Sequence, residues 1–238
     1  MEWNPEKYEQ WFDTPQGQFA LEREVQLLQS VVAGWPRRGR KLLEIGCGTG
    51  LFLEMLYQMG FDVSGLDASQ DMVAAARQRF RNRAELYHGN GELLPFAENE
   101  FDYAFLWSVL EFTADPAAML QEAARVAEKG ILIGFLNKNS LYYAMNVRGS
   151  KSTLDRGSWH TWCEMQDLIK ESTGFRPTLA RSVLPGPLTT WKQTGLGKRL
   201  NCCLCPPFVG AFCAVRVDFV NMKPLNPLFA WKQAPEMG

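Results

Sequence analysis

Three observations in the sequence predict an α/β fold of the Rossmann-like, doubly wound class, with a mostly parallel seven-stranded sheet. Short apolar runs alternate with segments of helical apolar spacing through the middle of the chain. A glycine-rich stretch directly follows the first apolar run, and a Pro- and Gly-rich interval separates the last two runs. The alternation is typical of βαβ units with parallel strands, and the last pair of runs predicts an antiparallel hairpin at the edge of the sheet.

The individual strands and helices follow from apolar spacing and from helix-start signals. Residues 103–109 are almost wholly apolar, as expected for a central strand that is covered on both faces. Ser69 and the pair Asp115-Pro116 are favourable residues at the start of a helix. The expected strands are residues 41–45, 61–66, 85–88, 103–109, 130–136, 178–183 and 210–220. The expected helices are residues 51–59, 69–80, 115–128 and 163–172.

The chain is predicted to have two parts. Residues 1–40 form an N-terminal helical cap, and residues 41–238 form the Rossmann-like domain. The alternation weakens at about 137–163, where a polar, glycine-containing stretch is a candidate substrate lid. Its aromatic residues, such as Tyr142 and Trp159, suit a small planar or apolar ligand.

The charge balance disfavours some classes of partner. The chain has 25 Lys and Arg against 26 Asp and Glu, a net charge of −1, so no nucleic-acid partner is expected, since such domains usually carry a basic surface. The start of the chain has no basic-then-apolar leader. The apolar stretch 202–220 contains prolines and charged residues that a bilayer core tolerates poorly. We therefore expect a cytoplasmic protein without a membrane span.

Cysteines do not indicate a metal site in this sequence. The chain has 6 cysteines, which we expect to stay reduced in an intracellular protein. Cys202, Cys203 and Cys205 form a cluster, but no second pair of Cys or His residues accompanies it to complete a four-ligand zinc site. No metal is therefore expected.

The glycine-rich stretch lies where the first strand meets the first helix, and its spacing is G-x-G-x-G at Gly46, Gly48 and Gly50. Glycines at this point permit a sharp turn and let a ligand approach the backbone and the free amides of the helix N-terminus. A dinucleotide fingerprint would have a further glycine where this chain has Leu51. Asp67 ends the second strand, at the spacing expected of an acid that accepts hydrogen bonds from ribose hydroxyls.

Residues 42–50 (Leu-Leu-Glu-Ile-Gly-Cys-Gly-Thr-Gly) resemble the first motif of the class I S-adenosylmethionine-dependent methyltransferases, and residues 65–69 resemble the second. Residues 88–96, 101–103 and 110–112 are similar to the third and fourth motifs of the small-molecule branch that includes the ubiquinone and menaquinone enzymes. The resemblance implies S-adenosylmethionine as cofactor, S-adenosylhomocysteine as product and a small-molecule methyl acceptor.

The resemblance also implies roles for the matching residues. The glycines would lie beside the methionine half of the cofactor, Glu44 would support its ammonium group, and Asp67 would hold the ribose. Asn90 stands where the family usually has Asp, and its carbonyl can still accept a hydrogen bond from the adenine amino group. The aromatic N-terminal segment resembles a helix that closes over the cofactor in some relatives, although an aromatic face packed on the domain is the other interpretation. The expected cofactor-binding residues are Tyr8, Trp11, Glu44, Gly46, Cys47, Gly48, Gly50, Asp67, Ala68, Met72, Asn90, Gly91, Glu92 and Trp107.

Catalysis by such an enzyme depends mainly on alignment of the two reactants. A sulfonium leaving group departs neutral, so a general base is needed only if the acceptor must lose a proton. Glu111 and His160 are the candidates for this base, with a capping or surface role as the alternative for each. A cofactor- or nucleotide-binding regulatory protein on the same fold remains the other hypothesis, whereas Leu51 disfavours an NAD-dependent oxidoreductase. The sequence leaves open the acceptor, the atom that is methylated and the oligomeric state.

Overall fold

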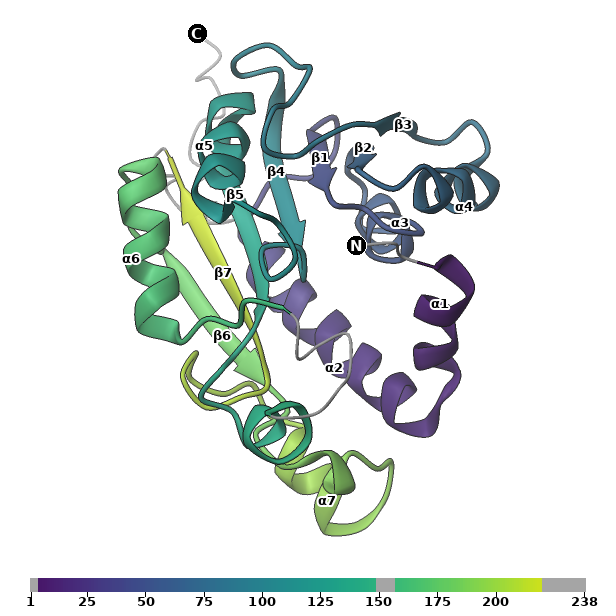
Figure 1. Ribbon diagram of the computed structural model, residues 1–238, viewed down its shortest axis with the longest axis vertical. Helices are drawn as coiled ribbons and strands as arrows, with labels where there is room; N and C mark the ends of the chain where they lie inside the picture. The colour runs from purple at the N-terminus through teal and green to yellow at the C-terminus, as the bar shows by residue number, and fades with distance from the viewer. Residues whose placement is uncertain (1–3, 149–156, 220–238) are drawn as a thin grey trace, which may run out of the picture.

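The computed structural model describes residues 4–148 and 157–219, and every structural statement below concerns these residues. Their core is a seven-stranded sheet with the strand order β3-β2-β1-β4-β5-β7-β6 (Figure 1). The strands are β1 (Lys41–Ile45), β2 (Asp62–Asp67), β3 (Glu85–His88), β4 (Phe101–Trp107), β5 (Ala127–Leu136), β6 (Leu179–Val183) and β7 (Phe212–Asp218). The helices are α1 (Pro5–Asp13), α2 (Pro15–Val32), α3 (Leu51–Gln58), α4 (Gln70–Phe80), α5 (Pro116–Val126), α6 (Trp162–Thr173) and α7 (Gly195–Asn201).

The pairing of the strands confirms the predicted fold class. Strands β1 to β5 pair in parallel. Strand β7 is antiparallel to both of its neighbours, β5 and β6, so β6 and β7 form the expected antiparallel pair at one edge. The carboxyl ends of β1, β2 and β4 therefore lie at the same edge of the sheet, which is where ligands bind in open α/β folds.

Two hydrophobic cores lie on the two faces of the sheet. Helices α2, α3 and α4 contribute to one core, and α5 and α6 contribute to the other. Strand β4 supplies both cores by alternation, because Tyr103, Phe105 and Trp107 point to the first and Ala104 and Leu106 to the second. The direction of Trp107, at the end of β4, is therefore fixed by the strand period.

Side-chain caps define where most of the helices begin. Ser69 Oγ accepts from Met72 N–H at 3.4 Å at the start of α4, and Asp115 Oδ1 accepts from Ala118 N–H at 3.0 Å at the start of α5. Both predicted caps are thus confirmed. Thr161 and Glu164 form a capping box at the start of α6.

Helix α2 is part of the same core as the sheet. Phe19, Leu27, Leu28 and Val31 are fully buried. The Trp35 ring, just beyond α2, stacks on Tyr103 of β4, with centroids 4.0 Å apart. No helix in the described ranges is long and apolar enough to cross a membrane.

Some predicted boundaries are wrong, and tertiary contacts explain the differences. The helix expected at 115–128 ends at Val126, because β5 begins directly at Ala127 and pairs with Phe101. Strand β4 ends at Trp107, because Ser108 adopts a φ of 51° and turns the chain. The Pro- and Gly-rich interval, expected to be a loop, contains α7 and a short 3-10 turn at Leu188–Thr190. Residue 220, the expected end of the last strand, lies outside the described residues.

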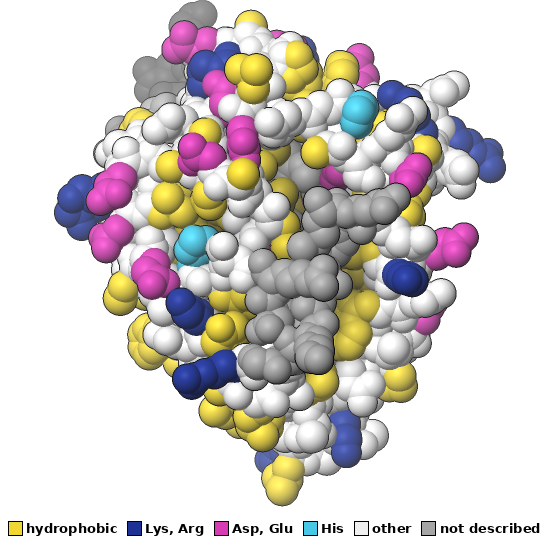
Figure 2. All heavy atoms as spheres, viewed as in Figure 1, with side chains coloured by type: hydrophobic (Ala, Val, Ile, Leu, Met, Phe, Trp, Pro, Cys, Tyr) yellow, Lys and Arg dark blue, Asp and Glu magenta, His cyan; other side chains and the backbone are white. Residues whose placement is uncertain are grey.

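Figure 2 shows the arrangement of side chains on one face of the molecule. Hydrophobic side chains are visible over much of this face, and Lys, Arg, Asp and Glu side chains lie among them in mixed order. The surface visible in this view therefore has no single-sign charged stripe among its described side chains.

Candidate active site

The glycine loop turns sharply between β1 and α3. Gly46, Gly48 and Gly50 all have positive φ angles, of 75°, 53° and 79°. A Cβ added at Gly46 would lie 2.4 Å from Val109 Cγ2, whereas one added at Gly48 would meet nothing within 4 Å. The loop is therefore packed tightly against Val109 at Gly46 and has free space beside Gly48, as a loop that receives a ligand requires.

Asp67 connects the end of β2 to this loop. Its Oδ2 accepts from Gly48 N–H and its Oδ1 accepts from Ser69 N–H, both at 2.8 Å. Burial raises the pKa of Asp67, and the two backbone hydrogen bonds lower it. A carboxylate offers about four lone-pair positions, so Asp67 retains acceptor capacity for two hydroxyl groups.

Two further carboxyls lie on the same side of the sheet. Glu44 of β1 is buried, and its Oε2 has no hydrogen-bond partner. Glu24 of α2 is partly buried, and its Oε2 accepts from Trp107 Nε1–H at 3.1 Å. Burial raises the pKa of Glu24 to about 7, and raises that of Glu44 well above its ordinary value. Neither carboxyl forms an ion pair within the described ranges.

Tyr8 of α1 brings the N-terminal helix to these carboxyls. Burial raises the pKa of its hydroxyl, and the charges of Glu24, Glu44 and Asp67 raise it further. Electrostatic coupling of this kind requires proximity, so the hydroxyl lies near the ends of β1 and β2. The structure thus brings the predicted residue Tyr8 near Glu44 and Asp67, close enough for their charges to act on its hydroxyl.

Arg79 of α4 fastens α1 in this position. Its Nη2 forms an ion pair with Glu9 of α1, its Nη1 lies 3.3 Å from Glu54 Oε2 of α3, and its Nε donates to the Thr49 carbonyl at 3.0 Å. One guanidinium therefore links α1, α3 and the glycine loop. No side chain of α1 is fully buried, so this contact is important for the position of the helix.

The remaining residues that were predicted to bind the cofactor differ in how far they are exposed to solvent. Met72 and Cys47 are buried and Ala68 is exposed. Trp11 is 37% exposed, so it projects partly into solvent rather than into the group around Tyr8. Trp107 is buried and packs on Phe52, with ring centroids 5.4 Å apart.

The third predicted motif has a partly structural role. Asn90 Oδ1 accepts from Glu92 N–H at 3.0 Å. Glu92 Oε1 in turn accepts from the N–H groups of Ala114 and Asp115, at 3.0 and 2.9 Å. Gly91 has no room for a side chain, because a Cβ there would lie 2.7 Å from Ile45 Cγ2. The Glu92 carboxylate therefore holds the turn before α5 in place.

Glu111 lies beyond the end of β4, between that strand and β5. It is buried, and its Oε1 accepts from Leu136 N–H at 2.5 Å while its Oε2 has no partner. Burial raises the pKa of Glu111 to about 7. The carboxyl is therefore partly protonated near neutral pH, and one of its oxygens is buried without a hydrogen-bond partner.

His160 lies beside the same edge of the sheet. It forms a β-bridge with Asn137, directly after β5, and its carbonyl accepts from Lys138 N–H at 3.0 Å. Its Nε2 is buried without a partner, and burial lowers the pKa of the ring. Because Ser158 N–H donates to the Glu111 carbonyl at 2.7 Å, the chain that carries His160 is joined to the chain that carries Glu111.

Aromatic rings join the two described ends of the predicted lid. Tyr143 packs on Trp159 with centroids 4.9 Å apart, and Tyr142 stacks on Trp191 at the same distance. Residues 149–156 of this stretch lie outside the described residues. The aromatic contacts therefore connect the stretch to the segment between β6 and α7, a connection that the sequence did not indicate.

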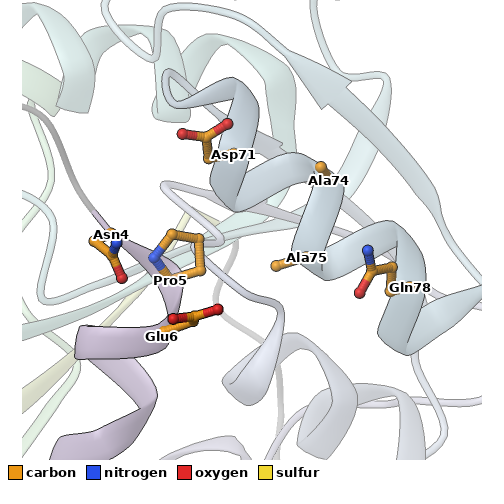
Figure 3. A pocket seen from close by; sticks show the side chains of 7 residues that line it. All are labelled: Asn4, Pro5, Glu6, Asp71, Ala74, Ala75 and Gln78. Atoms are coloured by element: carbon orange, nitrogen blue, oxygen red, sulfur yellow. The ribbon is translucent and has the colours of Figure 1, made fainter.

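A pocket of about 380 Å³ lies between the start of α1 and the outer side of α4 (Figure 3). Its lining residues are Asn4, Pro5, Glu6, Asp71, Ala74, Ala75 and Gln78. None of these is among the predicted cofactor residues, and none is aromatic. The lining of the pocket therefore shares no residue with the group of carboxyls formed by Glu24, Glu44 and Asp67.

The cysteine cluster follows α7. Cys202 Sγ lies 3.8 Å from Cys203 Sγ, and Cys205 Sγ contacts the Cys203 carbonyl. Within the described ranges no three His, Cys, Asp or Glu residues are arranged to hold a metal ion. The expectation that the cluster binds no zinc remains a prediction, which elemental analysis of the purified protein would test.

Glu24 and Asn137 are polar residues of the site that sequence reasoning missed. Asn137 is buried, and its Nδ2 donates to the Gly210 carbonyl at 3.0 Å. Glu24 interrupts the apolar stripe of α2, four residues after Ala20 and four before Leu28. An acid at this helical spacing was the available signal for Glu24, whereas the partner of Asn137 is 73 residues away.

Comparison with known proteins agrees with this arrangement. Residues 43–134 match the family described as a methyltransferase domain. An uncharacterized protein of Mycobacterium tuberculosis is 32% identical over 186 residues, 76% of this chain and 61% of that protein. The ubiquinone biosynthesis O-methyltransferase of Roseobacter denitrificans is 28% identical over 70% of this chain and 72% of its own length. The chain thus spans about three fifths of the mycobacterial relative.

Solved structures show the same fold. A Thermotoga maritima protein described as an S-adenosylmethionine-dependent methyltransferase and possible histamine N-methyltransferase has a TM-score of 0.72 at 25% identity, covering 90% of this chain and 95% of that one. The magnesium protoporphyrin IX methyltransferase of Synechocystis, with bound S-adenosylhomocysteine, has a TM-score of 0.64 at 18% identity, covering 90% and 93%. In its fold, and in the methyltransferase domain that residues 43–134 match, the chain is therefore similar to S-adenosylmethionine-dependent methyltransferases.

Proposed function

We propose that this protein transfers a methyl group from S-adenosylmethionine to a small-molecule acceptor. The observation that carries the proposal is the free Oε2 of Glu111, a buried carboxyl at the carboxyl ends of β4 and β5. Burying an acid without a hydrogen-bond partner costs stability, so the position of Glu111 at the edge of the sheet where ligands bind favours a role toward the acceptor.

The residues around the glycine loop fit the cofactor. The space beside Gly48, the acceptor capacity of Asp67 and the unpartnered Glu44 Oε2 meet the needs of a ligand with hydroxyl and ammonium groups. When bound, S-adenosylmethionine supplies a methyl group on a sulfonium, whose departure as a neutral thioether needs no acid. In this role Asp67 accepts from the ribose hydroxyls, and Glu44 stabilises the positive charge.

Tyr8 and Glu24 complete this side of the site. Tyr8 closes the site from α1, and Glu24, held by Trp107, adds a second carboxyl on the α2 side. Both residues keep water away from the reacting centre, which strengthens electrostatic interactions there. Trp11 lies on the outer, partly exposed side of α1.

The acceptor side is formed by β4, β5 and the aromatic stretch after β5. Glu111 is the general base for an acceptor that must lose a proton, because its pKa of about 7 suits proton transfer near neutral pH. His160 is the second candidate, since burial keeps its ring neutral and able to accept a proton. Tyr142, Tyr143 and Trp159 favour a planar or largely apolar acceptor, and residues 137–163 act as its lid.

Two relatives suggest where a search for the acceptor begins. One relative is named as an O-methyltransferase of ubiquinone biosynthesis, and one solved structure is described as a possible histamine N-methyltransferase. Phenols and aromatic amines are therefore the first compounds to screen. A cytoplasmic location, and the division into a cap at 1–40 and a domain at 41–238, also belong to this proposal.

The first experiment measures cofactor binding by thermal unfolding. S-adenosylmethionine and S-adenosylhomocysteine raise the midpoint by mass action, while NADH, the control ligand, does not. The absence of a shift at millimolar cofactor would reject the assignment.

The second experiment measures release of S-adenosylhomocysteine with a panel of phenols and amines. Once an acceptor is found, Glu111→Gln is expected to lower kcat about 100-fold, within the range for loss of a general base, with cofactor affinity unchanged. Cofactor binding without turnover of any panel member would instead favour the regulatory alternative.

A further inference from the structure

The end of the molecule that carries α7, at the bottom of Figure 1, has exposed apolar side chains. Leu196 of α7 is 82% exposed, Met145 is 64% exposed, and Phe208 is 58% exposed. We call this surface the apolar tip. Its exposed side chains are Leu141, Met145, Leu196, Leu200, Leu204 and Phe208.

The chain that forms the tip is firmly folded underneath. Trp191 is buried and donates its Nε1–H to the Gly186 carbonyl at 3.0 Å. Asn201, at the end of α7, is also buried, and its Nδ2 donates to the carbonyls of Thr190 and Gly197. These contacts fix the backbone of the tip, so the exposure of its apolar side chains is a property of the folded chain.

Two segments distant in sequence combine in the tip. Tyr142 stacks on Trp191, with ring centroids 4.9 Å apart. Leu141 and Met145, on either side of Tyr142 in the chain, therefore belong to the same end of the molecule as α7. Figure 1 shows α7 projecting beyond the ends of β6 and β7, so this end is a protrusion rather than a groove.

The charged residues of the segments that form the tip are cations. Residues 185–211, which run from the end of β6 through α7 to the start of β7, contain three Lys and Arg and no Asp or Glu, although the whole chain has a net charge of −1. Lys192, Lys198 and Arg199 of this segment are exposed. Residues 137–148 likewise contain Lys138 and Arg148 but no acid. Figure 2 shows hydrophobic side chains at this end with Lys and Arg side chains next to them.

One acid lies at the margin of this surface. Gln193 Nε2 donates to Glu22 Oε1 of α2 at 2.8 Å. Glu22 also forms an ion pair with Arg23, so its charge is partly balanced within α2. The net charge around the tip therefore remains positive.

We propose that the apolar tip docks on an anionic lipid surface, with its apolar side chains in the interfacial layer and its cations on the lipid phosphates. Exposed apolar groups flanked by Lys and Arg are the combination that interfacial binding uses, because apolar burial and attraction to anionic lipids act together. Large exposed apolar patches on folded proteins mark interaction sites. The protruding shape and the absence of acids in 185–211 favour a bilayer over a protein groove.

The experiment is co-sedimentation of the full chain with lipid vesicles. The protein is expected to bind vesicles of equal phosphatidylglycerol and phosphatidylcholine at least tenfold more tightly than vesicles of phosphatidylcholine alone. Binding is expected to weaken as salt rises, because salt screens the charge term. Absence of binding to the anionic vesicles would overturn the proposal.

Two variants separate the apolar and charged contributions. The first is a triple variant, Leu196→Ser/Leu200→Ser/Phe208→Ser, which is expected to bind the anionic vesicles more than tenfold more weakly at all salt concentrations. Lys192→Gln/Lys198→Gln/Arg199→Gln is expected to reduce binding at low salt by about fivefold for each cation and to remove most of the salt dependence. Wild-type binding by both variants would overturn the proposal.

Controls distinguish the tip from the rest of the surface. Leu93→Ser removes a side chain that is 77% exposed elsewhere on the molecule, and Arg38→Gln removes an exposed cation. Both are expected to bind like the wild type, and circular dichroism checks that every variant is folded. A wild-type dimer that the Leu and Phe substitutions dissociate, without vesicle binding, would instead assign the tip to an interface between copies of this chain.

Discussion

The half of the sheet formed by β1, β2 and β3 differs from the half formed by β5, β6 and β7 in the range of its contacts. In the first half the contacts between the glycine loop and the end of β2 close over short distances in sequence, as when Gly48 N–H donates to Asp67, 19 residues away. In the second half the contacts join distant segments, as when Asn137 binds Gly210 or Tyr142 stacks on Trp191. A site built from neighbouring segments leaves a motif in the sequence, whereas a site built from distant ones does not.

Gly46→Ala should produce the largest effect, because it tests the tightest contact of the first half. The new methyl group would overlap Val109, and the φ of 75° would be strained for alanine. We expect a loss of stability of about 2 to 5 kcal/mol and a loss of cofactor affinity of roughly 100-fold. Urea unfolding and calorimetry measure the two effects.

A matched control separates backbone strain from overlap. Gly39 has a φ of 66° but no neighbour within 4 Å of an added Cβ. Gly39→Ala should therefore cost stability only through strain and leave cofactor affinity unchanged. Val109→Ala should partly restore Gly46→Ala, and failure to do so would show that the contact with Val109 is not the cause.

Asp67→Ala should have the next largest effect. Loss of a charged acceptor for two hydroxyls costs about 1.5 to 3 kcal/mol, or on the order of ten- to a hundredfold in cofactor affinity. Calorimetry with S-adenosylhomocysteine measures the change. The exposed acid at the start of the same strand, Asp62→Ala, is the control, and equal affinities for the two variants would place the ribose elsewhere.

Glu111→Gln tests the second half of the sheet through the pH dependence of stability. The pKa of Glu111 is raised from 4.5 to about 7 in the folded protein, so its contribution to stability is present below about pH 4.5 and is lost as the pH rises through 7. As the pH rises from 5 to 8, the free energy of unfolding of the variant should therefore increase by about 1 to 3 kcal/mol relative to that of the wild type.

Urea unfolding at several pH values provides the measurement for Glu111. The exposed Glu98→Gln is the control and should show no such change. If the free energies of unfolding of Glu111→Gln and the wild type differ by the same amount across this pH range, burial does not raise the pKa of the carboxyl.

Arg79→Gln should have the smallest effect. Its ion pair with Glu9 joins side chains that are 25% and 45% exposed, and exposed pairs contribute less than about 1 kcal/mol. We expect cofactor affinity to fall by about two- to fivefold, since α1 is held less firmly over the glycine loop. Arg83→Gln is the matched control, because Arg83 also pairs with Glu54 but does not contact Glu9. If the two variants lose cofactor affinity equally, the contact between Arg79 and α1 plays no part in cofactor binding.

The sequence by itself determined the class of fold and the position of the glycine loop. Apolar runs of strand length between helical segments require parallel βαβ units, and the caps Ser69 and Asp115 act within a single turn. Gly48 and Asp67 could be recognised because they lie in two consecutive βα units, 19 residues apart. The order of residues along the chain is therefore enough to predict local features of this kind.

Only the tertiary structure decided how the distant segments meet. Glu24 differs from the other acids of α2 because its carboxylate accepts a hydrogen bond from Trp107 at the end of β4. The pKa of Glu111 is raised because the protein core buries its carboxyl group next to the amide of Leu136. The helix α7 forms where a loop was expected, since Asn201 and Trp191 anchor it. Burial and electrostatic coupling depend on distances in space, which the spacing of residues along the chain does not fix.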